Sequence, residues 1–160
     1  MNKQINMLAK NLGEQLKEKR WMLATAESCT GGLVAAAITD IPGSSAWFDR
    51  GFVTYANDAK VDLLSVSQYL LTNYGAVSLE VAKAMAEGAL ANSQAQVAVA
   101  TTGVAGPDGG SRHKPVGTVC FALAIEHQET KVFRYVFSGD RQAVRVQSVE
   151  YVLLKLLRCL

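Results

Sequence analysis

A serine that is followed by two glycines is the part of the sequence best suited to chemistry. Ser28 lies in TAESCTGG, residues 25–32, between a predicted strand and an Ala-rich predicted helix. Backbone N–H groups at a helix start lack helical partners and can face a developing anion, and glycine lets a ligand approach closely. We therefore interpret Ser28 as a nucleophile, with oxyanion donors around Thr30, Gly31 and Gly32. A helix cap is the structural alternative for Ser28 and Thr30.

The base that this serine needs is not expected to be a histidine. His113 lies in a glycine-rich loop and His127 in a predicted hairpin turn, where both are expected to be exposed. Tyr55 and Lys60 are better placed, at a strand end and in the first turn of the next helix. An ammonium about 4 Å from the phenol offsets the roughly 4 kcal/mol that ionising tyrosine costs at pH 7. A desolvated lysine can also act as the base itself, so the proton acceptor stays open.

A thiol nucleophile is a second possibility, because Cys29 follows the serine and a helix start can lower the pKa of a thiol. The other cysteines are Cys120 and Cys159, and the three have no spacing typical of a metal site. An odd number of cysteines without such spacing indicates reduced thiols and a cytoplasmic protein. We expect neither a metal nor a cofactor.

Two further segments are suited to binding a ligand. The loop TTGVAGPDGG, residues 101–110, follows a buried strand but lacks the GxGxxG and GxxxxGK[ST] spacings of standard nucleotide loops. Its glycines can still present N–H groups to a phosphate or an amide. The residues of this loop expected to contact a ligand are Thr102, Gly103 and Gly106. Arg141 and Arg145 share one face of the last predicted helix, where they suit a phosphate.

The composition indicates one compact α/β domain spanning residues 1–160. The chain has 160 residues, of which 49% are apolar and 19% charged, and its net charge is +2. This charge is too small to indicate nucleic acid or an anionic membrane as a partner. The N-terminus does not resemble a signal peptide, and no apolar run is long enough to span a membrane.

Helices alternate with strands along the chain, which predicts a layered α/β fold. The last two strands read as a hairpin, so we expect a mixed, mostly parallel sheet of about five strands. The expected strands are 21–26, 51–55, 96–101, 116–125 and 130–137, and the expected helices are 2–20, 31–40, 67–74, 140–157 and two that start near 58 and 78. Trp47 and Phe48 are expected in the core. The sequence leaves a homo-oligomer open.

Six blocks of this sequence resemble the CinA C-terminal domain family, most closely its stand-alone members. The blocks are TAESCTGG, GSSAWFDRGFVTYANDAK, GAVS, TTGVAGPDGG, KPVGTV and FSGDR, in the same order. The resemblance implies a three-layer α/β/α fold and the deamidation of nicotinamide mononucleotide to nicotinate mononucleotide and ammonia, in pyridine nucleotide salvage. It places the family's serine, tyrosine and lysine on Ser28, Tyr55 and Lys60, which ranks Ser28 above Cys29.

The implied chemistry assigns a role to each predicted group. Ser28 attacks the carboxamide carbon, its proton passes to the tyrosine–lysine pair, and water then releases the acyl group. We expect Glu27 to sit against the cationic pyridinium, and Arg141 or loop 102–110 to bind the phosphate.

Two other functions remain open at this point. A nucleotide- or protein-binding module of the same fold could keep the pocket without the chemistry. A Ser/Lys hydrolase of another amide is the second alternative, although the S-x-x-K spacing is absent.

Overall fold

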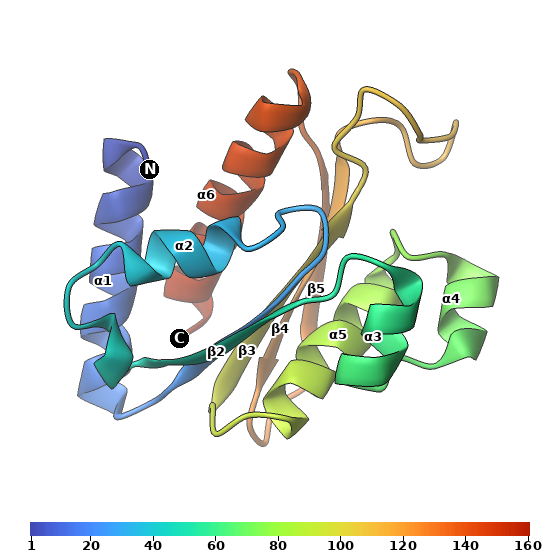
Figure 1. Ribbon diagram of the computed structural model, residues 1–160. Coiled ribbons are helices and arrows are strands. Elements are labelled where there is room, and N and C mark those ends of the chain that lie inside the picture. Colours follow the sequence, from blue (N-terminus) through green and yellow to red (C-terminus); the bar gives the residue numbers. More distant parts are fainter.

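Five strands form one mixed sheet in the computed structural model, which describes residues 1–160 (Figure 1). Their order across the sheet is β2-β1-β3-β4-β5. The strands are β1 Leu23–Glu27, β2 Phe48–Val53, β3 Val97–Gly103, β4 Thr118–Ile125 and β5 Lys131–Val136. β1 is parallel to β2 and β3, whereas β4 is antiparallel to β3 and β5. Parallel and antiparallel pairs are therefore equal in number, where the sequence predicted mostly parallel pairing.

Helices cover both faces of the sheet, which gives the three layers that the resemblance implied (Figure 1). α1, α2 and α6 lie on one face, and α3, α4 and α5 lie on the other. The helices are α1 Lys3–Lys19, α2 Leu33–Thr39, α3 Asn57–Leu64, α4 Gln68–Tyr74, α5 Leu79–Ala91 and α6 Arg141–Cys159, with a 3-10 turn at Ser44–Ala46. None of them combines the length and the apolar character that crossing a bilayer requires.

The central strand β3 alternates its side chains between two cores. Val97 and Val99 pack into the core beneath α1, α2 and α6, whereas Ala98 and Ala100 pack into the core beneath α5. β3 is therefore buried on both faces, as its continuous apolar run predicts. The alanines leave room for α5 to lie close to the sheet.

The boundaries of some elements differ from the prediction because tertiary contacts decide them. β2 begins at Phe48, where its pairing with Leu23 of β1 starts, rather than at residue 51. Trp47 is 1% exposed, which confirms its expected core position. Its ring lies against Gly13 of α1, where a Cβ would meet ring atoms at 2.6–2.8 Å.

The parallel arrangement of β1, β2 and β3 brings their carboxyl ends to one edge of the sheet. Ser28 follows β1, the segment 54–60 follows β2, and the glycine-rich loop follows β3. Ligand sites of α/β sheets form at such an edge. The start of α6 reaches the same end of the molecule (Figure 1).

Close packing of α3 on α5 positions Lys60, which lies on α3. A Cβ at Gly88 of α5 would lie 2.1 Å from the carbonyl oxygen of Leu64, the last residue of α3. Gly88→Ala should therefore lower the free energy of unfolding by about 1–3 kcal/mol, measured by urea denaturation. Lys83→Ala, at an exposed position of α5, is the control and should change it by less than about 0.5 kcal/mol. Equal stability of the two variants would contradict this tight contact.

Candidate active site

The side chains of Ser28 and Lys60 meet at the edge of the sheet. Lys60 Nζ lies 3.1 Å from Ser28 Oγ, 2.8 Å from the carbonyl oxygen of Thr54 and 3.0 Å from that of Tyr55. Lys60 is 1% exposed and Ser28 is 9% exposed. Lys60 forms no ion pair, because the chain's two salt bridges involve other residues. A buried amine without an ionic partner thus lies within hydrogen-bond distance of a serine hydroxyl.

Lys60 Nζ donates to all three of these oxygens. A neutral amine, with two N–H donors and one lone pair, can keep both carbonyl bonds and turn its lone pair toward the hydroxyl of Ser28. Burial lowers the pKa of Lys60, because removing the ammonium from water disfavours its charged form. Lys60 is therefore suited to take a proton from Ser28.

The thiol of Cys29 is a poor nucleophile in this position. Cys29 is buried, and this burial raises the pKa of its thiol to about 12. The reactive thiolate is accordingly scarce at neutral pH. The predicted ranking of Ser28 above Cys29 agrees with this environment.

The phenol of Tyr55 does not pair with Lys60, contrary to the prediction. Tyr55 is 58% exposed, and its hydroxyl accepts a hydrogen bond of 2.9 Å from Arg141 Nη2. Only the backbone carbonyl of Tyr55 contacts the lysine. The prediction was wrong because the strand end turns the tyrosine side chain outward, toward the start of α6, while its carbonyl points inward.

Glu27 is directed beneath α2 and not toward a ligand. Its carboxylate accepts hydrogen bonds from the hydroxyl of Thr30 at 2.6 Å and from three backbone N–H groups at 2.9–3.2 Å. The three N–H groups belong to Gly32, Val34 and Ala35. Glu27 is 1% exposed. Its position therefore does not support the predicted contact with a pyridinium, and indicates a helix cap instead.

The hydroxyl of Thr30 belongs to the same buried network. It lies 2.7 Å from the hydroxyl of Thr101 and is not exposed. Because Thr30 donates its proton to Glu27, Thr101 donates to Thr30. Gly31 and Gly32 have φ of 58° and 100°, and their N–H groups donate to Ser28 O and Glu27. Both predicted glycine donors are thus already occupied within the protein.

The loop after β3 contributes less to the site than predicted. The hydroxyl of Thr102 donates to the carbonyl of Ala76 at 2.8 Å and is buried. A Cβ at Gly103 would lie 2.7 Å from Thr118 O, so this glycine permits close pairing with β4. Gly106 has a φ of 81°, and its carbonyl accepts a hydrogen bond of 2.9 Å from Arg141. Of these three predicted loop residues, only Gly106 contacts Arg141.

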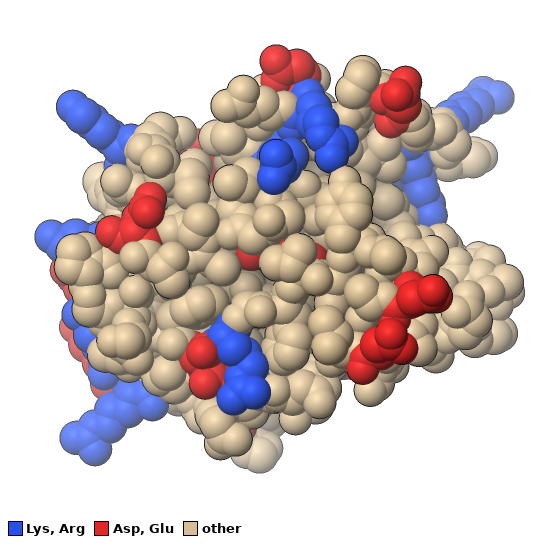
Figure 2. All heavy atoms as spheres, viewed as in Figure 1, with Lys and Arg blue, Asp and Glu red and all other residues tan.

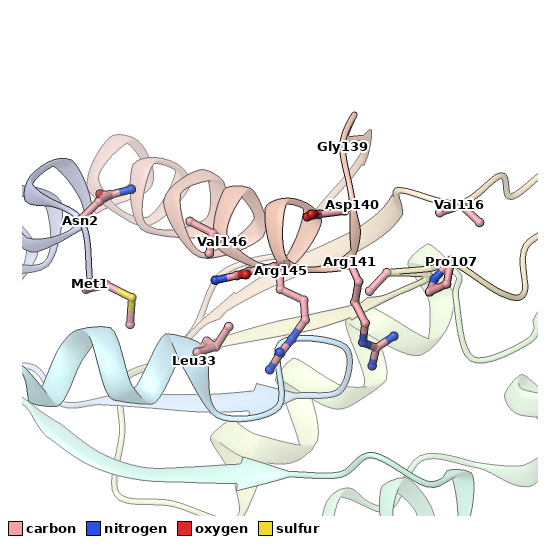
Figure 3. Close-up of a pocket in the computed structure, with 12 residues that line it drawn as sticks. Met1, Asn2, Leu33, Pro107, Val116, Gly139, Asp140, Arg141, Arg145 and Val146 are labelled. Carbon is pink, nitrogen blue, oxygen red and sulfur yellow. The ribbon is translucent and has the colours of Figure 1, made fainter.

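A cavity of about 1060 Å³ lies next to this site, and neither Ser28 nor Lys60 is among the residues that line it (Figure 3). It lies between the N-terminal ends of α1, α2 and α6 and the loop after β3, and its lining includes Leu33, Pro107, Arg141 and Arg145. The two arginine side chains extend from the first turns of α6 in the same direction (Figure 3). Basic side chains also gather near this end of α6 on the surface, whereas the middle of this face is largely uncharged (Figure 2).

Arg145 connects this cavity to the serine loop. Its guanidinium donates to the carbonyl of Cys29 at 3.1 Å and to that of Thr30 at 3.0 Å. The sequence placed Arg145 on one face with Arg141 but did not indicate this contact. No three His, Cys, Asp or Glu side chains are grouped so as to hold a metal ion.

The fold and this site define the class of protein. The model of the CinA C-terminal domain matches residues 5–160, and the chain belongs to the CinA C-terminal domain family. It is 54% identical to the nicotinamide-nucleotide amidohydrolase PncC of Enterobacter agglomerans, over 98% of this chain and 95% of that protein. It is 52% identical to the protein of the same name from Escherichia coli (strain K12), over 94% and 91%.

Solved structures show the same fold. The competence/damage inducible protein CihA from Agrobacterium tumefaciens superposes with a TM-score of 0.96 at 45% identity, covering 99% of this chain and 96% of that one. A CinA superfamily protein from Escherichia coli superposes with a TM-score of 0.94 at 40% identity, covering 98% and 90%. Longer relatives also match: a putative competence-damage inducible protein of Symbiobacterium thermophilum is 53% identical over 96% of this chain but only 38% of its own length.

The lowered pKa of Lys60 predicts a pH-dependent stability. Between the folded pKa and the ordinary value of about 10.4, the unfolded chain binds more protons, so wild-type stability rises with pH across that window. Lys60→Met removes this group. The free energy of unfolding of the wild type minus that of Lys60→Met should therefore increase as the pH rises toward 10. Lys83→Met, at an exposed site, is the control, and a pH-independent difference for Lys60→Met would contradict the lowered pKa.

Proposed function

We propose that this protein is a nicotinamide-nucleotide amidase, which hydrolyses nicotinamide mononucleotide to nicotinate mononucleotide and ammonia in pyridine nucleotide salvage. Relatives with 52–54% identity over nearly their whole length carry the name nicotinamide-nucleotide amidohydrolase. The observation that carries the mechanism is the buried, unpaired amine of Lys60 at 3.1 Å from Ser28 Oγ. The three free cysteines favour a cytoplasmic location.

Lys60 serves as base and then as acid in this proposal. The neutral amine accepts the proton of Ser28 while its two N–H groups stay bonded to the carbonyls of Thr54 and Tyr55. Ser28 Oγ attacks the carboxamide carbon and forms a tetrahedral intermediate. The Lys60 ammonium then protonates the departing nitrogen, and the C–N bond breaks to release ammonia. Water, deprotonated by Lys60, hydrolyses the acyl-enzyme to the carboxylate and restores Ser28.

Arg141 is the proposed phosphate contact. Its guanidinium lines the cavity beside the serine loop and has no carboxylate partner. Two of its nitrogens donate to Tyr55 Oη and to Gly106 O, and a guanidinium has five N–H donors in all. A phosphate can therefore use the remaining donors while Tyr55 stays in place at the rim. In this arrangement the phenol of Tyr55 positions Arg141 and is not the proton acceptor.

A non-catalytic nucleotide-binding module is the competing function. It would keep the cavity and the two arginines but would not need a buried lysine beside a serine. Ammonia release from nicotinamide mononucleotide, nicotinamide riboside and nicotinamide, assayed in parallel, separates the two functions. Nucleotide binding without ammonia from any of the three would favour the module.

Replacement of the nucleophile gives the sharpest test. Ser28→Ala should lower kcat for ammonia release by at least about a thousandfold, because the acyl-enzyme cannot form. Cys29→Ala removes only a buried, protonated thiol and should keep most of the activity. Both variants should be checked for folding by circular dichroism. Near wild-type turnover by Ser28→Ala, or loss of turnover in a folded Cys29→Ala, would reject the serine assignment.

A further inference from the structure

The turn that follows Ser28 contains two backbone donors without a protein acceptor. The N–H of Gly31 donates to Ser28 O at 3.0 Å, which closes a four-residue turn. The N–H groups of the two intervening residues, Cys29 and Thr30, donate to no backbone or side-chain oxygen of the chain. Unpaired N–H groups in a buried segment are rare, since each costs free energy. These two are therefore the donors beside Ser28 that remain available to a ligand.

Arg145 fixes the direction of the Thr30 donor. The bond from Gly31 N–H to Ser28 O fixes that of the Cys29 donor. Arg145 holds the carbonyls of Cys29 and Thr30 with Nε and Nη2, at 3.1 and 3.0 Å. In a trans peptide the C=O and the N–H point in opposite directions. With the Cys29 carbonyl held toward Arg145, the N–H of Thr30 points away from the guanidinium. The close-up shows the Arg145 side chain descending from α6 to the loop before α2 (Figure 3).

The opposite side of the turn is held by the buried carboxylate of Glu27. This carboxylate accepts from the Thr30 hydroxyl and from the N–H groups of Gly32, Val34 and Ala35. It thereby occupies donors at the start of α2 that would otherwise compete for an anion. Arg145 also leaves little space at Gly31, where a Cβ would lie 3.3 Å from Nη2. The turn is thus restrained from two sides.

We infer that the N–H groups of Cys29 and Thr30 form the oxyanion hole for the Ser28 reaction, and that Arg145 is the positioning residue that orients the Thr30 N–H and holds the turn that carries both donors. This inference rests on the proposed amidase function. It assigns the two arginines of α6 different roles: Arg141 contacts the phosphate, whereas Arg145 acts through the loop backbone. Oxyanion donors stabilise the transition state more than the bound substrate, so their loss affects kcat.

Steady-state kinetics on nicotinamide mononucleotide separate the two roles. Arg145→Met should lower kcat about 10²- to 10³-fold while KM stays within about twofold. Arg145→Lys keeps one donor near the carbonyls and should recover part of this loss. Arg141→Met is the matched control on the same helix face, and it should raise KM roughly tenfold. An increase in KM without loss of kcat in Arg145→Met would overturn the inference in favour of a ligand contact.

A thioamide substrate distinguishes an oxyanion role from a general structural one. Sulfur accepts hydrogen bonds more weakly than oxygen, so ammonia release from thionicotinamide mononucleotide depends less on N–H donors. Arg145→Met should therefore lower the rate on the amide much more than the rate on the thioamide. An equal loss on both substrates would overturn the inference.

The controls keep this inference separate from the proposed function. If Arg145→Met does not fold, as judged by circular dichroism, the comparison is made with Arg145→Lys. A wild type that releases no ammonia from nicotinamide mononucleotide would overturn the proposed function and this inference together. An active wild type whose amide-to-thioamide rate ratio is unchanged by the Arg145 substitutions would overturn this inference alone.

Discussion

The removal of the Lys60 amine from water is the physical constraint on which the site depends. A buried ammonium without an ionic partner costs several kcal/mol, so the surroundings favour the neutral form. The carbonyls of Thr54 and Tyr55, just after β2, accept two of its N–H groups, and Ser28 is the third neighbour. The close contact of α5 with the end of α3 keeps the helix that carries Lys60 against the sheet. Packing in the core beneath α5 thus offsets the free-energy cost of burying the Lys60 amine.

At the end of β1, the consecutive side chains of Glu27 and Ser28 point to opposite sides of the sheet. Glu27 points to the α2 side, where four donors neutralise the cost of burying its charge. Ser28, the next residue, meets Lys60 from α3 on the other side of the sheet. One carboxylate therefore restrains the loop from one side while the neighbouring hydroxyl stays in contact with Lys60. Arg141 and Arg145 extend from the first turns of α6 toward the same edge of the sheet (Figure 3).

The sequence predicted the layers of the fold and the meeting of Ser28 with Lys60. Both follow from the alternation of elements, because the carboxyl ends of parallel strands share one edge of the sheet. The directions of individual side chains could not be predicted in the same way. Tyr55 and Glu27 each occupy a strand end, where one or two backbone angles decide whether a side chain faces the site. The contact of Arg145 with the serine loop joins residues 115 or more positions apart, and no local pattern indicates it.

The central claim is that burial lowers the pKa of the Lys60 amine, so that this amine can take the proton of Ser28. A titration of the lysine ε-carbons by NMR, in the free wild-type protein, tests this claim most directly. The account predicts that the Lys60 resonance titrates clearly below the ordinary lysine pKa of about 10.4. A Lys60 resonance that titrates at this ordinary value would contradict the account.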